Sequence, residues 1–506
     1  MKRDATYNKK TKKNILFLTI SQIVTIAFGL VMPRLILRAY GSEVNGLLNS
    51  IMQVISYLAL FEAGIQNVAK QQLYKSIVNN DENETNSILS AVNKNYKKIG
   101  LFYFLFLIGL GVVYPLIAKC ETVDFFGIFL IVVFSGLGNV VLFFVQGKYQ
   151  ILLTSDGKTY VLTVFGTIVS ILSHSVKVAM LLLGCNIVLV IAITFAISLI
   201  QSVLVIIYVK HKYKWVDLKV DPKPDCLKQS KYALVHQISG QIFTHIDVIL
   251  LTIFCGLKIV SVYSIYKMIS NYLRTAIVIP LDSGSFALGQ TFNKDREKYI
   301  RYLDSVDVLL TSLVFGVFSV MVLLAEPFVG LYTSGITDVN YIWLFLPFLF
   351  AICEALNIIN APSNSTVAFA GKFKETTLKT IIKTIINLTV SIVGVLLLGI
   401  YGVLLGTIAA LAYSNIDFLF YSNKKILNRS PIKPLMIHMS NLLLFLLISA
   451  VSVFVKINVS SYLEFAKYGI VLTTIIVPFF ILFSITIFKG ERAMAVSIMK
   501  NFFNRK

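Results

Sequence analysis

Stretches of about twenty apolar residues recur along the whole chain, and short polar segments separate them. A helix that crosses the ~30 Å hydrocarbon core of a bilayer needs ~20 apolar residues, so each stretch predicts one membrane span. The first half of the chain holds seven, at 14–38, 45–64, 98–118, 124–146, 160–183, 186–209 and 233–256. The second half holds seven more, at 258–280, 303–325, 339–359, 376–399, 402–422, 435–457 and 465–488. The pattern predicts an all-α polytopic membrane protein of about fourteen transmembrane helices.

Composition excludes a soluble protein of this length, because 57% of the 506 residues are hydrophobic and only 14% are charged. The mean hydropathy of +0.79 is typical of a chain that lives in a bilayer. The spans leave only short loops, so a large extramembrane domain is excluded as well. The formal net charge is +21. In a membrane protein such an excess usually gathers in cytoplasmic loops, so it does not indicate nucleic-acid binding.

Lysine and arginine are distributed unevenly between the two predicted sides of the membrane. With the N-terminus inside, the inside segments hold 36 of the 46 basic residues, the outside segments hold six, and four lie within spans. The positive-inside rule then predicts that both termini are cytoplasmic. The longest connection, from Gln66 to Lys98, is expected to form an interfacial amphipathic helix followed by a solvated turn.

An offset of 214 or 215 residues aligns several segments of the chain with one another in equivalent topological places. The aligned glycines are Gly41 with Gly256, Gly157 with Gly371, and Gly184 with Gly399. Each copy holds six helices, an even number, so we expect two lobes related as a parallel repeat by an axis along the membrane normal. The predicted division is an N-lobe at 1–220, a C-lobe at 221–430, and a C-terminal helix pair with a basic cytoplasmic tail at 431–506.

Polar residues three or four positions apart form stripes on several spans. Such a stripe faces either a wet cavity or a neighbouring helix. The candidates to line a polar cavity are Asn49, Gln53, Ser173, His174, Asn271 and Asn387. The repeat offset places Asn387 on Ser173, which predicts equivalent polar faces in the two lobes. The alternative for these side chains is ordinary hydrogen bonding between helices.

Charged residues inside the spans give sharper predictions, because each costs ~2.5 to 3.5 kcal/mol at the centre of a span. Six cations are predicted to bind an anionic substrate, namely Arg34, Arg38, Lys177, Lys267, Arg274 and Lys383. The deepest acids, Asp247 and Glu354, are candidates for coupling transport to H⁺ or Na⁺. The alternative for the cations is pairing with acids or snorkelling to the interface.

No motif in the chain predicts catalysis or a bound metal. The five cysteines are scattered and form neither a CxxC pair nor a Cys/His cluster. The sequence has no phosphate-binding P-loop and no HExxH pattern, and its loops are too short for a membrane glycosyltransferase. We therefore expect a protein that is not an enzyme and that has no cofactor or metal site.

Two segments around the first helical pair carry a family resemblance. Residues 36–47 (ILRAYGSEVNGL) and 57–65 (YLALFEAGI) resemble the corresponding region of Wzx-type polysaccharide repeat-unit flippases. These flippases belong to the multidrug/oligosaccharidyl-lipid/polysaccharide exporter superfamily. The resemblance implies two six-helix lobes around a central cavity with two added C-terminal helices, in agreement with the count made from hydropathy. It also implies a cationic cavity, which would suit a diphosphate.

The resemblance further implies a function in the bacterial plasma membrane. It predicts that the protein moves an undecaprenyl-diphosphate-linked oligosaccharide to the outer leaflet by alternating access, for capsule, O-antigen or exopolysaccharide assembly. The expected partners are this lipid-linked oligosaccharide, membrane lipids, and a polysaccharide polymerase or glycosyltransferase. The alternatives are a lipid II flippase, a cation-coupled multidrug exporter of the same architecture, and, outside transport, a membrane scaffold protein.

Overall fold

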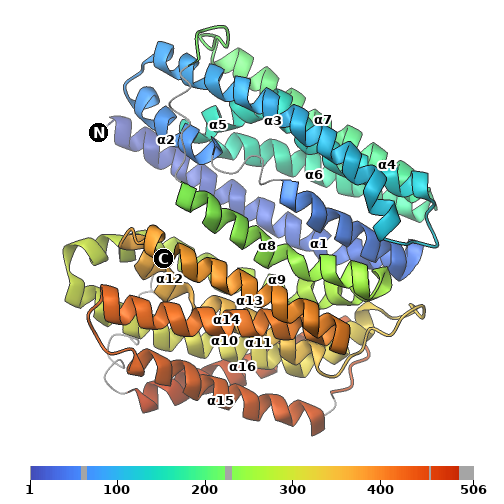
Figure 1. The fold of residues 1–506 in the computed structure, drawn as a ribbon, viewed down its shortest axis with the longest axis vertical. Helices are drawn as coiled ribbons and strands as arrows, with labels where there is room; N and C mark the ends of the chain where they lie inside the picture. Colours follow the sequence, from blue (N-terminus) through green and yellow to red (C-terminus); the bar gives the residue numbers. More distant parts are fainter. Residues whose placement is uncertain (1, 59–64, 223–230, 455–456, 489–506) are drawn as a thin grey trace. The chain divides into compact units, whose positions relative to one another are not determined.

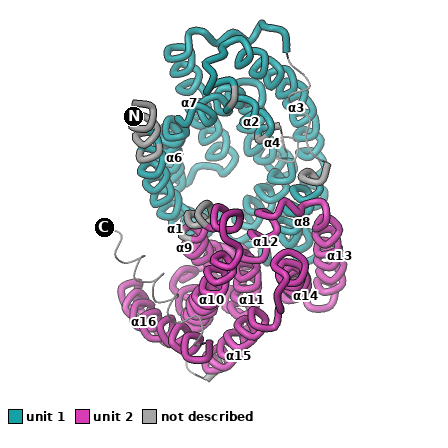
Figure 2. Tube along the Cα trace, turned by 90° about the vertical axis from the view of Figure 1, so that its left-hand side faces the viewer, with its two compact units in different colours: residues 1–261 teal, residues 262–506 magenta. Residues whose placement is uncertain are grey.

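The computed structural model describes residues 2–58, 65–222, 231–454 and 457–488, and within these ranges it contains helices and no strands (Figure 1). Twelve helices of the described part are long and apolar enough to cross a membrane. The prediction of an all-α polytopic membrane protein is therefore confirmed. The chain packs into two compact units, residues 1–261 and residues 262–506 (Figure 2).

Unit 1 holds the first eight helices and the start of the ninth. They are α1 (Lys2–Leu58), α2 (Ile65–Val78), α3 (Glu82–Ile117), α4 (Phe125–Val141), α5 (Gly147–Ser155), α6 (Thr159–Leu182), α7 (Ile187–Lys212), α8 (Lys231–Phe254) and α9 (Leu257–Lys294). A π-helical turn, Leu142–Gln146, joins α4 to α5. Unit 1 ends at residue 261, whereas the predicted N-lobe ends at residue 220, so unit 1 also contains α8. The predicted lobe boundaries at 220 and 430 stay a prediction.

Unit 2 holds the rest of α9 and the remaining helices. They are α10 (Arg296–Tyr332), α11 (Leu346–Ile359), α12 (Ala361–Phe369), α13 (Phe373–Leu398), α14 (Ile400–Tyr421), α15 (Ile432–Phe454) and α16 (Tyr462–Ile487). A π-helical turn, Ser422–Ile426, follows α14. Helix α10 packs against α11, α15 and α16, so the appended helix pair is attached to the unit mainly through α10.

The difference between fourteen predicted spans and twelve counted helices has two local reasons. Helix α1 contains the predicted spans 14–38 and most of 45–64, and the two halves meet at Gly41, whose φ of 80° is not helical. Helix α9 covers the predicted span 258–280 but carries Lys267 and Arg274 and is not among the twelve. The count of about fourteen is consistent with the structure.

The segment predicted as an interfacial helix and turn forms α2 and the start of α3. Helix α2 packs on α3 and α5, and the side chains of Ala69 and Leu73 are fully buried. The apolar face of α2 is therefore covered by protein at Ala69 and Leu73. The turn that follows contains Asn80 at a φ of 53°, a conformation that asparagine tolerates better than most residues.

The internal repeat is visible in the local backbone of the two aligned copies. Each of the three aligned glycine pairs shares a positive φ: 80° and 84° at Gly41 and Gly256, 70° and 67° at Gly157 and Gly371, and 68° and 58° at Gly184 and Gly399. Glycine is favoured at such positions because it has no Cβ to clash. The same offset relates two helix caps, since Asp81 accepts from the backbone N–H of Glu84 and Asp295 accepts from that of Lys298. The axis that relates the lobes stays a prediction.

Helices α13 and α14 approach each other so closely that their backbones touch. A Cβ at Gly402 would lie 1.9 Å from the carbonyl oxygen of Gly394, and a Cβ at Gly406 would lie 2.1 Å from Oγ of Ser391. Small residues permit such contact between membrane helices, whose association depends on packing and hydrogen bonds.

Gly402→Ala is therefore expected to destabilise the protein by roughly 1 to 3 kcal/mol, because the two backbones must separate. The thermal unfolding midpoint in detergent measures this change. Gly109→Ala is the matched control, since Gly109 lies in α3 and a methyl group added there would have no atom of another helix within 4 Å. Equal midpoints for the two variants would contradict the close packing of α13 on α14.

Candidate functional site

An ion-pair triad inside unit 2 contains two of the predicted substrate-binding cations. Lys267 and Arg274 lie seven residues apart on α9, about two helical turns, and both reach Glu354 of α11. The Lys267 Nζ atom lies 3.7 Å from Oε1 of Glu354, and the Arg274 Nε atom lies 3.8 Å from Oε2. The Glu354 side chain is 4% exposed, whereas those of Lys267 and Arg274 are 32% and 43% exposed. The triad therefore presents its cations toward accessible space and keeps its carboxylate buried.

At Lys267 and Arg274 the structure favours the alternative that the sequence offered, pairing of the cations with an acid. Glu354, predicted as an ion-coupling acid, is the shared counter-ion of Lys267 and Arg274. One carboxylate between two cations leaves a formal excess of one positive charge. Both contacts are longer than a hydrogen bond, and Oε2 of Glu354 is buried without a hydrogen-bond partner among the described residues. The arrangement can attract an anion, but less strongly than two unpaired cations would.

Unit 1 contains a cation that has no counter-ion among the described residues. Lys177 of α6 is half-buried, and its Nζ atom makes no hydrogen bond or ion pair with any described residue. One turn earlier on the same helix, the ring of His174 stacks on Phe28 of α1, with 4.6 Å between ring centroids. The Nδ1 atom of His174 is buried and has no partner in the described part of the chain. Together they give this part of α6 unused hydrogen-bonding capacity.

Apolar contacts hold α1 against this part of α6. Met32 and Ile36 of α1 form a buried cluster with Leu181 of α6. The two predicted arginines, Arg34 and Arg38, belong to the same stretch of α1, where Arg34 is half-buried and Arg38 is exposed. The structure thus brings the helical segments that carry Arg34, Arg38 and Lys177 together within unit 1, as a substrate-binding role would require.

The polar stripe on the second half of α1 bonds mainly to α8. Gln53, a predicted cavity residue, hydrogen-bonds through Oε1 to Nδ1 of His245. The hydroxyls of Ser50 and Thr252 lie 2.6 Å apart in the same interface. Asn49, also predicted to line the cavity, donates to the backbone carbonyl of its own helix at Asn45. At Gln53 the structure therefore favours the alternative role, hydrogen bonding between helices.

Asn387 also forms a hydrogen bond between helices, and it is more deeply buried than Gln53. Its side chain is fully buried, and its Nδ2 atom donates to Oγ1 of Thr407 on α14 at 3.1 Å. The neighbouring Ser391 donates to the carbonyl oxygen of Val403. A residue enclosed between two helices in this way does not line an open cavity, so this prediction is corrected.

The remaining predicted residues differ in exposure. Asn271 is exposed on α9, whereas Ser173 and Lys383 are half-buried. Asp247 of α8, the other predicted coupling acid, is 3% exposed and interacts with other described groups. Lys267, the intramembrane cation that follows Asp247 in the chain, has Glu354 as its counter-ion.

Sequence reasoning missed a charged cluster at the turn between α5 and α6. The carboxylate of Asp156 accepts from Lys10 at 2.9 Å and from the hydroxyl of Tyr213 at 2.6 Å, and it forms an ion pair with Lys158 at 2.6 Å. The N-terminal part of α1 is thereby attached to the turn that precedes α6. The sequence offered one indication of this cluster: Asp156 precedes Gly157-Lys158 at a position where the second copy has Ala370. Its partners lie far away in the sequence, so this indication could not identify them.

Burial by itself raises the pKa of Asp156, but the hydrogen bonds from Lys158, Tyr213 and Lys10 outweigh burial and hold the pKa below its ordinary value. Burial and the bond to this carboxylate also raise the pKa of Tyr213. The carboxyl group of Asp156 is therefore ionised at neutral pH.

Asp156→Asn is expected to destabilise the protein by about 1 to 3 kcal/mol, because charge-assisted hydrogen bonds are lost. The folded-state pKa of Asp156 lies below the unfolded value of ~3.9, so the stabilisation is complete above that pH and disappears as pH falls through the folded-state pKa. Thermal midpoints in detergent at several pH values measure both effects. Asp221→Asn, at an exposed acid of the same connection as Tyr213, is the control. Equal midpoints for Asp156→Asn and wild type at neutral pH would contradict this account.

Comparison with known proteins shows similarity in fold. The sequence matches no protein-family model and no curated protein. The arrangement of the helices is nevertheless similar to that of solved membrane transporters. The lipid II flippase MurJ, in an inward closed conformation, matches with a TM-score of 0.70 at 15% identity, over 94% of this chain and 99% of that one.

Two MATE transporters extend the comparison. An inward-facing MATE family transporter of the MOP superfamily has a TM-score of 0.59 at 13% identity, over 86% of this chain and 99% of its own. A mutant of the Vibrio cholerae MATE transporter VcmN has a TM-score of 0.54 at 15% identity, over 84% and 99%. The chain therefore has the fold that MurJ shares with MATE transporters. These three structures are of a flippase and of transporters, not of enzymes.

Proposed function

We propose that this protein is a flippase for undecaprenyl-diphosphate-linked oligosaccharide repeat units in the bacterial plasma membrane. It would supply capsule, O-antigen or exopolysaccharide assembly on the outer side. The observation that carries the proposal is the positive excess of its intramembrane charges. Lys177 has no counter-ion among the described residues, and Lys267 and Arg274 share the single carboxylate of Glu354. A diphosphate supplies the missing negative charge.

The proposed mechanism is alternating access. The anionic headgroup leaves water at the cytoplasmic side, and cations in the membrane-spanning helices compensate for its lost hydration. The lipid tail stays in the hydrocarbon phase, and a conformational change then exposes the headgroup to the other side. Both termini are placed in the cytoplasm in this proposal, on the strength of the charge distribution in the loops.

Ion coupling is a further part of the proposal. Asp247 and Glu354 are buried acids inside helices, each 3% exposed, and a buried carboxylate can exchange a proton or a sodium ion as access alternates. Glu354 is the stronger candidate for a role in the cycle, because its ion pairs are long and one of its oxygens has no hydrogen bond.

A lipid II flippase is the second candidate function. The higher TM-score of MurJ than of the two MATE transporters favours a lipid substrate. The excess of cations suits either lipid-linked anion and argues against a cation-coupled exporter of cationic drugs. A membrane scaffold would not need an unpaired lysine inside a span, because such a residue costs stability.

Deletion of the gene in its own host separates these functions. The proposal predicts that lipid-linked oligosaccharide accumulates in the inner leaflet, that surface polysaccharide falls, and that peptidoglycan synthesis continues. Arrest of peptidoglycan synthesis with intact surface polysaccharide would identify a lipid II flippase instead. A change in drug sensitivity alone would identify an exporter, and no change in any of these would favour a scaffold.

A further inference from the structure

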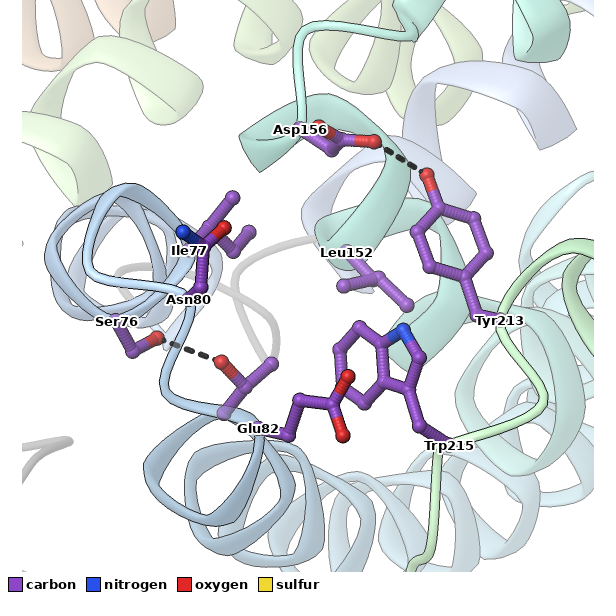
Figure 3. A pocket seen from close by; sticks show the side chains of 9 residues that line it. Ser76, Ile77, Asn80, Glu82, Leu152, Asp156, Tyr213 and Trp215 are labelled. Carbon is purple, nitrogen blue, oxygen red and sulfur yellow. Dashed lines mark hydrogen bonds between the residues drawn. The ribbon is translucent and has the colours of Figure 1, made fainter.

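A cavity of about 180 Å³ lies at one end of unit 1, among the ends of several helices. Its apolar walls include Ile77 at the end of α2 and Leu152 of α5. Tyr213 and Trp215 line it from the segment after α7, and Glu82 lines it from the first turn of α3 (Figure 3). Asp156 lies at its edge. These helix ends belong to the side that the charge distribution predicts to be cytoplasmic.

The wall that carries Trp215 is fixed to α3 by hydrogen bonds. Asn86 donates through Nδ2 to the carbonyl oxygen of Trp215 at 3.0 Å, and its Oδ1 accepts from the backbone N–H of Asp217 at 3.1 Å. Ser90 donates to the carbonyl oxygen of Leu218 at 3.3 Å. The cavity is thus preformed, so a ligand would lose little affinity to ordering of the protein.

The two acidic residues that line the cavity, Asp156 and Glu82, differ in their hydrogen bonds and ion pairs. Asp156 is fully engaged by Lys10, Lys158 and Tyr213. Glu82, in contrast, forms no hydrogen bond or ion pair with any described residue, and its side chain points toward the cavity beside Trp215 in Figure 3. One available carboxylate next to aromatic rings and apolar walls is the combination that binds an alkyl cation.

The residue at the equivalent sequence position of the second unit is an arginine. Arg296 follows Asp295 as Glu82 follows Asp81, at the repeat offset of 214 residues. The Arg296 guanidinium lies 3.8 Å from the centroid of the Phe292 ring, and its Nη2 atom donates to the carbonyl oxygen of Ile426 at 2.7 Å. In unit 2 this position therefore places a guanidinium group on an aromatic ring. In unit 1 the residue is an acid and the cavity remains open.

We propose that the cavity binds one alkylguanidinium group, presented as an arginine side chain by a partner protein on the predicted cytoplasmic side. Its volume lies below the ~300 to 1,000 Å³ of sites for drug-sized ligands and suits a single side chain. A guanidinium stacks on an aromatic ring and bonds to a carboxylate in the same plane better than an ammonium does. The site is separate from the intramembrane cations, so this inference does not depend on the proposed flippase function.

The experiment uses the two tryptophans of the chain. Trp343→Phe leaves Trp215 as the single tryptophan, so the fluorescence of the purified full-length protein reports on the cavity. Agmatine, which carries a guanidinium and a primary ammonium group, should produce a saturable change in emission. Putrescine, which has ammonium groups only, and the uncharged N-butylurea should not. Adding Glu82→Gln should weaken agmatine binding by about tenfold or more. Glu297→Gln, at an exposed acid in the first turn of α10, is the matched control and should have no effect.

A second variant tests the comparison between the units. Glu82→Arg copies the residue at the equivalent position of unit 2 and should abolish agmatine binding while the thermal midpoint is kept. The inference is overturned if agmatine gives no saturable signal, if putrescine or N-butylurea binds equally well, or if Glu82→Gln or Glu82→Arg binds agmatine like the parent. A short acetylated, amidated peptide with one arginine distinguishes the source. Binding at least as tight as that of agmatine supports a protein side chain, and binding of agmatine alone overturns the protein partner in favour of a free amine.

Discussion

Replacing Lys177 with glutamine is expected to weaken binding of a lipid-linked diphosphate headgroup by about 10- to 150-fold. This range corresponds to the ~1.5 to 3 kcal/mol of one hydrogen bond to a charged group. Lys177 is half-buried and has no bonding partner among the described residues, so its loss should leave expression and thermal stability unchanged or improved. The measurement is binding of undecaprenyl-diphosphate oligosaccharide to the purified protein in detergent.

Lys258→Gln is the control for this experiment, because Lys258 is an exposed lysine at the start of α9. It should bind the headgroup like the wild type. If Lys177→Gln also binds like the wild type, the role of Lys177 in the substrate site is wrong. If Lys177→Gln loses thermal stability instead, the lysine has a structural role.

Removing both cations of the unit 2 triad is expected to destabilise the protein by about 3 to 5 kcal/mol, because Glu354 is then buried without a counter-ion. Lys267→Gln or Arg274→Gln alone should cost much less, since each leaves one cation within 4 Å of the carboxylate. Thermal midpoints in detergent should therefore fall steeply only in the double variant.

The triple variant with Glu354→Gln is the matched control for the double variant. Without the carboxylate no buried charge is left unpaired, so the thermal midpoint should return close to that of the wild type. A double variant as stable as either single variant would contradict the shared counter-ion. A triple variant as unstable as the double variant would show that packing, not charge, is lost.

The helices were predictable because each depends on properties that lie within a short segment. The span predicted at 160–183 became α6 at Thr159–Leu182, and the span predicted at 376–399 became α13 at Phe373–Leu398. The turns that precede these helices need a residue at positive φ, and glycine at positions 157 and 371 provides it. The repeat was therefore readable from the positions of a few glycines.

The use of the polar residues was not predictable in the same way. Spacing shows that Asn387 and Ser391 share one helix face, but it does not show that α14 covers that face through Gly402 and Gly406. Lys177 and Asn387 both lie inside predicted spans, and only the structure shows that Asn387 is enclosed between two helices whereas Lys177 bonds to none of the described residues.

Ion pairs between segments far apart in the sequence could not be predicted for the same reason. Glu354 is 87 residues from Lys267, and Asp156 is 146 residues from Lys10. No local pattern links such positions, because the pairing depends on how whole helices pack. The sequence supplied the candidate charges, and the packing decides which of them are neutralised.

Reconstituted lipid transport is the most direct test of the central claim. Purified protein is placed in liposomes that contain a fluorescent undecaprenyl-diphosphate oligosaccharide in both leaflets, and a membrane-impermeant quencher is added outside. The account predicts that wild-type protein allows nearly all the fluorescence to be quenched. Protein-free liposomes should keep about half of it, which is the inner-leaflet share expected from two equal leaflets. Lys177→Gln should slow the quenching of the inner-leaflet lipid. Quenching by the wild-type protein that stops at the protein-free level would contradict the account.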